Sequence, residues 1–336
     1  MKDSRRILSI SRVFPLPDWV REEVVKLFVK YIEVTRSSVV VLEDEDGFFC
    51  YVPYRHRFSG NEIVQRFDEV FNRASKKYRM GVWVTLTTDP KVYSNDSYLS
   101  YRYKIVKALN RFLSWLRKRF GRISYICVIE FTDSGLIHFH VVIFGLGRIE
   151  DYRVFTKRLV NWGFGRVNYL YQIVNINNEW KPRKVVRIDY CDGGGIPKEF
   201  SIVSRIGLKN YLKKYISKSL RSIRYINSIL SASNSSLDFI YSVSQTELKD
   251  GTSRNGLDTL KNGVWKLALY WALRLRFFSY SKNIMVSSKR IRVGRYSFVG
   301  VFSIERYIFY NNYFHDWLTY PTFLCIDVVS ATEVMF

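Results

Sequence analysis

The 336-residue chain has few cysteines, no long apolar run and a shortage of acidic residues. Its four cysteines lie far apart without a Cys-x-x-Cys pair, which argues against a disulfide framework and against a thiolate zinc site. No uncharged apolar run approaches the ~18 residues of a membrane span, and the segment before Pro15 has no apolar core typical of a secretory signal. The missing Gly-x-x-x-x-Gly-Lys-Ser/Thr loop argues against an ATP-driven helicase. We therefore expect a soluble cytoplasmic protein without a membrane partner.

Basic residues greatly outnumber acidic ones. The chain has 53 Lys and Arg residues against 30 Asp and Glu residues, for a net charge of +23. Residues 1–80 hold 15 basic and 12 acidic residues, whereas residues 81–336 hold 38 and 18. This concentration of positive charge predicts a polyanionic partner, although an anionic membrane surface would also attract it. With 47% hydrophobic and 25% charged residues, the composition is that of a folded globular protein.

The sequence pattern divides the chain into three regions. Residues 1–79 predict an accessory α/β region, with two helices around a hairpin. Residues 80–231 predict the order β-α-β-β-α-β followed by a long basic helix. That order is an α+β split βαβ layout, ferredoxin-like or RRM-like, with an antiparallel sheet and helices on one face. Residues 232–336 predict a polar loop, a helix at 257–278 and a β-rich, aromatic tail that can pack on the middle region. The predicted elements of the middle region are strands at 82–88, 125–131, 137–144, 166–173 and 185–190, and helices at 97–119, 151–162 and 206–230.

The predicted strand at 137–144 carries two of the chain's four histidines, His138 and His140. Residues i and i+2 of a strand share a face, so both imidazoles can reach one ion. A three-residue loop at 133–135 would pair Glu130 with His138 on that face, whereas a two-residue loop would turn Glu130 away. Gly135 in third place favours the longer loop. We therefore predict a ligand set of Glu130, His138 and His140 for Zn2+, Mn2+ or Mg2+. The alternative is a pair of structural histidines with Glu130 merely adjacent.

The predicted basic helix contains the pattern Tyr-x-x-Lys twice, as Tyr211/Lys214 and Tyr215/Lys218. These four residues form one helical stripe beside an apolar stripe that would dock on the sheet. Lysines on the tyrosine stripe argue against its deep burial, and a nearby ammonium favours the nucleophilic phenolate. The alternative is a basic amphipathic helix whose tyrosines border the core. The apolar stripe consists of Leu208, Leu212, Ile216, Leu220 and Ile223.

These two elements, in this order, resemble the HUH endonucleases, and more narrowly the two-tyrosine rolling-circle replication initiator (Rep) proteins of plasmids and small single-stranded DNA viruses. Residues 82–87 are similar to the family's apolar-Thr-Leu-Thr strand, and residues 135–142 to its His-hydrophobic-His motif. The resemblance covers about residues 80–220. Conjugative relaxases of the same superfamily place the tyrosine before the histidines, and related transposases carry one tyrosine, so both differ from this chain.

The resemblance implies a metal-dependent, site-specific endonuclease and strand transferase that acts on single-stranded DNA. It would initiate rolling-circle replication through a 5′-phosphotyrosine intermediate. Tyr215 corresponds to the obligatory nucleophile and Tyr211 to the partner used at termination. Mn2+ or Mg2+ would bind His138, His140 and Glu130. Lys214 or Lys218 would orient the phosphate or a metal-bound water.

The same resemblance implies the partners and the setting. These are single-stranded or cruciform origin DNA, a host helicase and polymerase, and the cytoplasm of a prokaryotic host that carries the plasmid or virus. Two alternatives stay open at the level of the sequence. One is an HUH-type transposase. The other is a non-catalytic module that binds single-stranded nucleic acid, whose sheet would present exposed aromatic residues.

Overall fold

The computed structural model is a mixed α+β fold built on a six-stranded antiparallel sheet, which confirms the predicted fold class. The sheet has the strand order β7-β6-β3-β5-β4-β8. Its strands are β3 (Met80–Thr87), β4 (Ser124–Phe131), β5 (Ile137–Phe144), β6 (Tyr169–Ile176), β7 (Glu179–Arg187) and β8 (Phe278–Tyr280). The structure describes residues 2–12, 16–36, 38–54, 58, 60–149, 152–165, 169–187, 198–232, 254–284 and 297–303.

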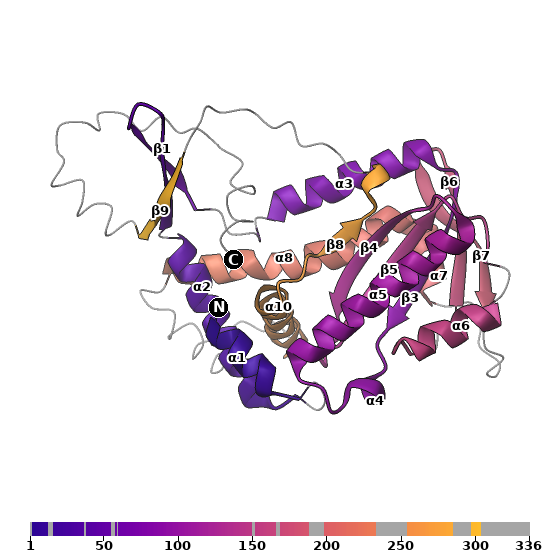
Figure 1. Ribbon diagram of the computed structural model, residues 1–336, viewed down its shortest axis with the longest axis horizontal. Helices are drawn as coiled ribbons and strands as arrows, with labels where there is room; N and C mark the ends of the chain where they lie inside the picture. Colours follow the sequence, from indigo (N-terminus) through magenta and orange to yellow (C-terminus); the bar gives the residue numbers. More distant parts are fainter. Residues whose placement is uncertain are drawn as a thin grey trace.

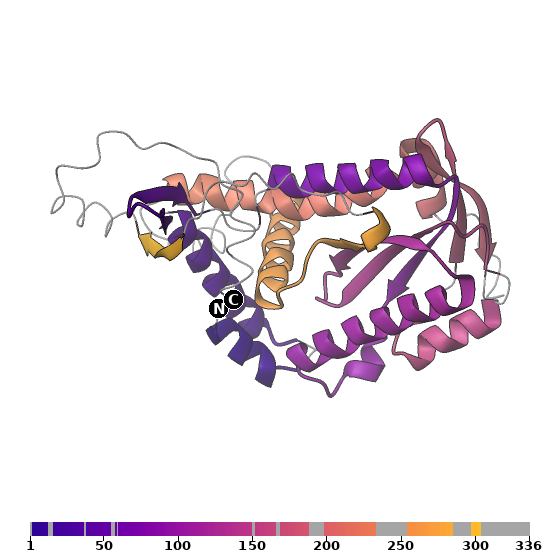
Figure 2. The same cartoon turned by 45° about the horizontal axis from the view of Figure 1, so that its top comes forward.

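The four central strands β6-β3-β5-β4 have the order of a split βαβ unit. Helix α5 (Tyr98–Phe120) connects β3 to β4, and α6 (Tyr152–Asn161) connects β5 to β6. Short α4 (Pro90–Tyr93) lies between β3 and α5. Both crossover helices pack on one face of the sheet (Figures 1 and 2), where Phe112 of α5 contacts Phe155 of α6 with ring centroids 5.7 Å apart. The residues of β5 that point to this face, such as Phe139 and Val141, are fully buried.

Two further helices cover the opposite face. Figure 2 shows the sheet between α5 and α6 on one side and α3 (Gly60–Lys77) and α8 (Leu208–Ala232) on the other. Phe71 of α3 packs edge-on against Phe144 of β5, with ring centroids 5.9 Å apart. The predicted apolar stripe of α8 is buried along its whole length, which explains why this helix docks instead of remaining in solvent. Asp68 of α3 forms ion pairs with Lys209 and Lys213 of α8 and so joins the two helices.

The basic helix that the sequence predicts from residue 206 is two helices. Helix α7 (Lys198–Ile206) ends at Gly207, whose φ of 77° lies in the left-handed region that favours glycine. The Gly207 N–H donates to the carbonyl of Val203 at 2.9 Å, and α8 then begins at Leu208 in a new direction. This break sets the angle at which Tyr211 and Tyr215 approach the sheet.

The first and last regions of the chain are interleaved in space. Strands β1 (Ser38–Glu43) and β2 (Phe49–Pro53) form the predicted hairpin, and β9 (Ser297–Ser303) adds to β1 as a third strand. Helix α10 (Arg254–Ala272) ends earlier than predicted and contacts both α8 and α2 (Asp18–Arg36). The chain then adds β8 to the edge of the main sheet, followed by the short η1 (Lys282–Ile284). Helix α1 (Lys2–Ile10) packs on α2 and α5.

Residues from all three regions share one hydrophobic core. Phe28 of α2 contacts Trp271 of α10 with ring centroids 5.7 Å apart, and Phe67 of α3 contacts Phe278 of β8 at 5.3 Å. Most of the predicted polar loop and most of the predicted β-rich tail lie outside the described residues. None of the helices within the described ranges combines the length and the apolar character that a membrane span requires.

Candidate active site

The hairpin β4–β5 has the three-residue loop that the sequence predicts. Thr132 N–H donates to the carbonyl of Leu136 at 2.9 Å, and Gly135 N–H donates to the carbonyl of Thr132 at 3.0 Å. Gly135 has a φ of 85°, which is the left-handed conformation expected at the third loop position. The resulting register puts Glu130 directly opposite His138. The carboxylate therefore lies on the histidine face of the sheet.

The two histidines lie side by side on β5, with ring centroids 4.9 Å apart. Their Nδ1 atoms face threonine hydroxyls of the neighbouring strand β3: Thr87 Oγ1 lies 2.9 Å from His138, and Thr85 Oγ1 lies 3.4 Å from His140. On the other side of its ring, His140 Nε2 is 3.2 Å from Glu130 Oε2. Outer hydrogen-bond partners of this kind fix the orientation of metal-binding imidazoles. The part played by the two threonines was missed from the sequence, because it depends on the β3–β5 register.

Both tyrosines of α8 lie over His140. The Tyr215 ring stacks on the imidazole with centroids 4.5 Å apart and planes at 17°, while the Tyr211 ring meets it edge-on at 6.1 Å. The Tyr215 hydroxyl donates a 2.6 Å hydrogen bond to the Tyr211 hydroxyl. Tyr211 also packs against Trp83 and is only 3% exposed, whereas Tyr215 is partly exposed. The prediction that lysines keep this stripe out of the core is therefore wrong for Tyr211.

Burial dominates the electrostatics of the site. Removal from water raises the pKa of Tyr211 to about 12 and raises the pKa of Tyr215 further, with additional effects from the Tyr211 hydrogen bond and the Glu130 charge. These shifts run opposite to the lysine-assisted phenolate that the sequence predicts, because burial outweighs any nearby ammonium. Burial also lowers the pKa of His138 to about 4, with His140 acting in the same direction and Glu130 against it. His138 is therefore neutral near pH 7, which is the form that coordinates metal ions.

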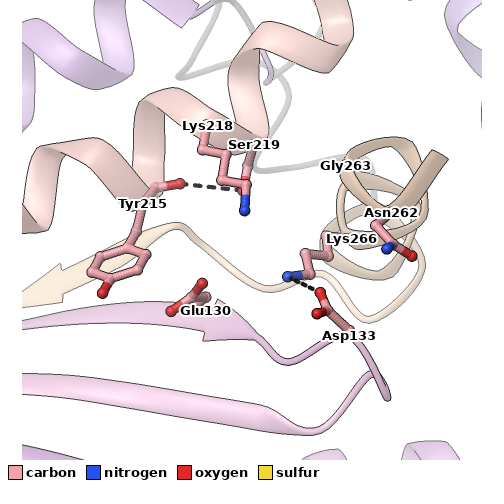
Figure 3. A pocket seen from close by; sticks show the side chains of 8 residues that line it. All are labelled: Glu130, Asp133, Tyr215, Lys218, Ser219, Asn262, Gly263 and Lys266. Carbon is pink, nitrogen blue, oxygen red and sulfur yellow. Dashed lines mark hydrogen bonds and ion pairs between the residues drawn. The ribbon is translucent and has the colours of Figure 1, made fainter. Parts of the chain in front are cut away.

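The two lysines of the repeated pattern differ in their surroundings. Lys218 lines a pocket of about 90 Å³ that also includes Tyr215 and Glu130 (Figure 3). Lys214 is exposed and is not among the eight residues that line this pocket. The structure thus brings one of the two predicted lysines to the edge of the site. The other five lining residues are Asp133, Ser219, Asn262, Gly263 and Lys266.

The chemistry of the donor set suits a divalent ion, since it offers two imidazoles and one carboxylate. The 3.2 Å between His140 Nε2 and Glu130 Oε2 also falls near the ~3.0–3.4 Å that separates two donors bound ~2.1 Å from one ion. In the described ranges, however, no group of three or more His, Cys, Asp or Glu side chains is arranged to hold a metal ion. His140 and Glu130 are thus already placed as a pair, and a three-ligand site requires a movement that brings in His138.

Known proteins resemble this chain in two ways. Residues 81–186 match a protein family described as "Replication-associated protein ORF2". The chain is also 25% identical over 281 residues to "Uncharacterized protein 1" of Halorubrum pleomorphic virus 1, a match that covers 79% of this chain and 49% of the viral protein. The chain therefore spans about half the length of that relative. The family match includes Glu130, His138 and His140 but ends before α8, so it does not reach the tyrosines. The comparisons relate the central sheet to replication-associated proteins and the longer chain to a viral protein.

Proposed function

We propose that this protein initiates rolling-circle replication by cutting and rejoining single-stranded DNA through a tyrosine. The observation that carries the proposal is the stacking of Tyr215 on His140, next to Glu130. A nucleophile from one helix and a candidate metal-binding strand thus meet at one point, as covalent catalysis on a phosphodiester requires. The match to replication-associated proteins supports the replication role.

The surroundings of the two phenols support different roles for them. Tyr215 is partly exposed and lines the pocket, so a DNA phosphate can approach its hydroxyl. Tyr211 is buried behind it and accepts its hydrogen bond. We therefore assign the first cut to Tyr215. Tyr211 acts in the later, terminating reaction, once Tyr215 carries the DNA end and no longer donates that hydrogen bond.

The reaction is an exchange of one phosphodiester for another. The Tyr215 oxygen forms a bond to phosphorus after losing its proton, and the bond from phosphorus to the 3′ oxygen breaks. The departing 3′ oxygen takes up a proton and becomes a 3′-OH on which a polymerase can extend. The 5′ end remains on the tyrosine as a phosphodiester, so attack by a later 3′-OH rejoins the strand without ATP.

His138, His140 and Glu130 would hold Mn2+ or Mg2+ in this proposal. The bound ion supplies a Lewis acid that polarises the phosphate and positive charge that opposes the raised pKa of Tyr215. Of the two lysines, Lys218 is the one placed to orient the phosphate, because it shares a pocket with Tyr215. Lys214, which is exposed, is better suited to contact the DNA backbone outside the pocket.

The features of the sheet favour this proposal over a passive nucleic-acid-binding module. An RRM-like platform binds bases on aromatic residues that the sheet leaves exposed. Here the corresponding central strand presents His138 and His140, and α8 covers it with two tyrosines. The net charge of +23 fits a DNA partner under either function, so it does not discriminate between them.

A cleavage assay on the full chain tests the proposal. Protein, Mn2+ and supercoiled DNA of the replicon that encodes the chain are incubated, and the denatured products are examined for protein attached to a 5′ end. We expect Tyr215→Phe to abolish attachment, Tyr211→Phe to retain the first cut, and EDTA to remove all cutting. Tyr103→Phe is the matched control, because that ring is 62% exposed on α5. Cutting that persists when both tyrosines are replaced contradicts the proposal, and integration into unrelated DNA would indicate a transposase instead.

A further inference from the structure

The pocket beside Tyr215 contains a buried cation that the proposed cleavage chemistry does not use. Lys266 of α10 extends into this pocket, between α8 and the β4–β5 turn (Figure 3). Its side chain is 10% exposed, and its Nζ lies 2.9 Å from Oδ1 of Asp133. The Asp133 side chain is 78% exposed, because it stands on the turn itself. The ion pair therefore joins a buried cation to a solvent-exposed anion.

This asymmetry makes Asp133 a replaceable partner. A buried ammonium needs an anion, because water cannot solvate it fully. An exposed carboxylate on a turn can swing into water at small cost. Two further cations act on the same point: Lys266 lowers the pKa of Asp133 most, and Lys218 and Arg21 add to the effect. Positive charge from α2, α8 and α10 thus converges where the Asp133 carboxylate lies.

We propose that this pocket binds a phosphate group of the DNA strand next to the phosphate under attack. Lys266 and Lys218 hold it, and Asp133 occupies its place until DNA arrives. The identification of the strand rests on the proposed function, because Tyr215 lines the same pocket. Lys266 acts here as a positioning residue, since it holds a neighbouring phosphate and does not contact the bond that breaks.

The size and the charges of the pocket fit a phosphate better than a second metal ion. A volume of about 90 Å³ is several times the ~10–15 Å³ that one water needs, so a group of five heavy atoms fits. Two ammonium groups in the lining disfavour a second cation. The other lining carboxylate, Glu130, is already paired with His140. Asn262 adds a side-chain amide that can donate a hydrogen bond to a phosphate oxygen.

The close approach of α10 to α8 builds the pocket. A side chain at Gly263 would force its Cβ into steric overlap with the hydroxyl oxygen of Ser222 on α8. Glycine at this position therefore allows the two helices to lie in contact. As a result, Lys266, one turn further along α10, faces Lys218 across the pocket.

Binding of a labelled single-stranded oligonucleotide, measured with EDTA present and over a range of salt concentrations, tests this inference separately from cleavage. We expect Lys266→Met to lower the affinity about tenfold and to reduce the salt slope by about 0.7, the value for one phosphate contact on a single strand. Lys266→Arg should retain the affinity. Asp133→Asn should raise it at least about threefold, because the competing anion is gone. Inorganic phosphate should compete for the site, and an uncharged nucleoside should not.

A surface ion pair on the far edge of the sheet supplies the matched controls. Lys181 and Glu179 of β7 lie 3.0 Å apart and are 42% and 64% exposed, so Lys181→Met and Glu179→Gln remove the same charges away from the pocket. The inference is overturned if Lys266→Met behaves like Lys181→Met, or if the nucleoside competes and phosphate does not. It is also overturned if Asp133→Asn weakens binding, since the ion pair would then be only a structural link. Asp133 is exposed, so this last result does not depend on whether Lys266→Met folds. If DNA binding changes as expected but no wild-type cleavage occurs, the phosphate pocket stands and the proposed function fails.

Discussion

His140 is held on three sides by residues from three different elements. Tyr215 of α8 stacks on its ring, Glu130 of β4 meets its Nε2, and Thr85 of β3 faces its Nδ1. The residue is 2% exposed, so its orientation is fixed before any DNA binds. A group that approaches Nε2 must replace the contact with Glu130. Preorganisation of this kind reduces the rearrangement required when a phosphate reaches the site.

Buried phenols give the chain a predicted weakness at alkaline pH. Burial raises the pKa of Tyr93 to about 12, with Asp96 and Asp89 adding to the effect, and burial also raises the pKa of Tyr101. The unfolded pKa of tyrosine is ~10, so the folded chain keeps protons that the unfolded chain releases. The stability linked to these groups is therefore complete below pH ~10 and is lost as the pH rises through 10 to 12.

Urea unfolding between pH 8 and pH 11.5 measures this loss, together with the ultraviolet absorbance of ionised tyrosine. We expect the midpoint to fall steeply above pH 10, and the native chain to ionise fewer tyrosines at pH 11 than the same chain in denaturant. A midpoint that stays constant, or native and denatured titrations that coincide, would contradict the assigned burial of these rings.

At the scale of elements, the β4–β5 turn determines whether Glu130 faces the histidines. Gly135 at its third position has a φ of 85°, and a Cβ there would lie 2.5 Å from the Tyr98 hydroxyl. Gly121, at the end of α5, has a similar φ of 74°, but a Cβ there would have no atom within 4 Å. The two glycines therefore share the backbone requirement, and only Gly135 adds a steric one.

Replacing each glycine by alanine separates the two effects. Gly121→Ala should cost about 1 kcal/mol of unfolding free energy for the left-handed backbone alone. Gly135→Ala should cost about 2–4 kcal/mol, because the Tyr98 contact adds overpacking to that strain. It should also impair cleavage in whatever fraction remains folded, since Glu130 depends on this turn. Chemical denaturation gives the comparison, and equal losses for the two variants would show that the turn can shift freely.

Several elements could be predicted from the sequence because their signals are local. The length of the β4–β5 loop and the glycine at its end were sufficient to predict the Glu130–His138 register. Other elements have signals that are weaker or not local. The Asn177-Asn178 turn, with φ values of 50° and 65°, brings β7 back earlier than predicted. Nothing in the pattern of α8 shows that Trp83 would bury Tyr211, because that contact depends on how the helix crosses the sheet.

At the scale of the whole molecule, the C-terminal region completes the sheet that carries the site. Phe277 accepts a backbone hydrogen bond from Ile129 of β4 at 2.8 Å, and Tyr270 of α10 donates one to the carbonyl of Ile129. Both contacts lie one residue from Glu130. The sequence predicted a C-terminal helix that can pack on the middle region, but not this pairing, because β-pairing between distant segments leaves no local pattern.

Truncation tests this dependence. A chain that ends at residue 232 lacks α10, β8 and β9, and with them several large aromatic residues that are almost fully buried. Loss of one such residue costs ~3–5 kcal/mol, against a total stability of ~5–15 kcal/mol, so we expect no cooperative thermal unfolding. A chain that ends at residue 284 keeps α10 and β8, and should still unfold cooperatively. Cooperative unfolding of the shorter chain would show that residues 80–231 fold without the C-terminal region.

The attachment site of the DNA tests the central claim most directly. Trypsin cuts after Lys213, Lys214 and Lys218, so the two tyrosines fall on separate peptides, residues 210–213 and 215–218. Mass spectrometry of the digested protein–DNA adduct then shows which tyrosine carries the nucleotide. The account predicts a nucleotide joined through its 5′ phosphate to the peptide of Tyr215. A nucleotide on a peptide with neither Tyr211 nor Tyr215, or one joined through a 3′ phosphate, would contradict it.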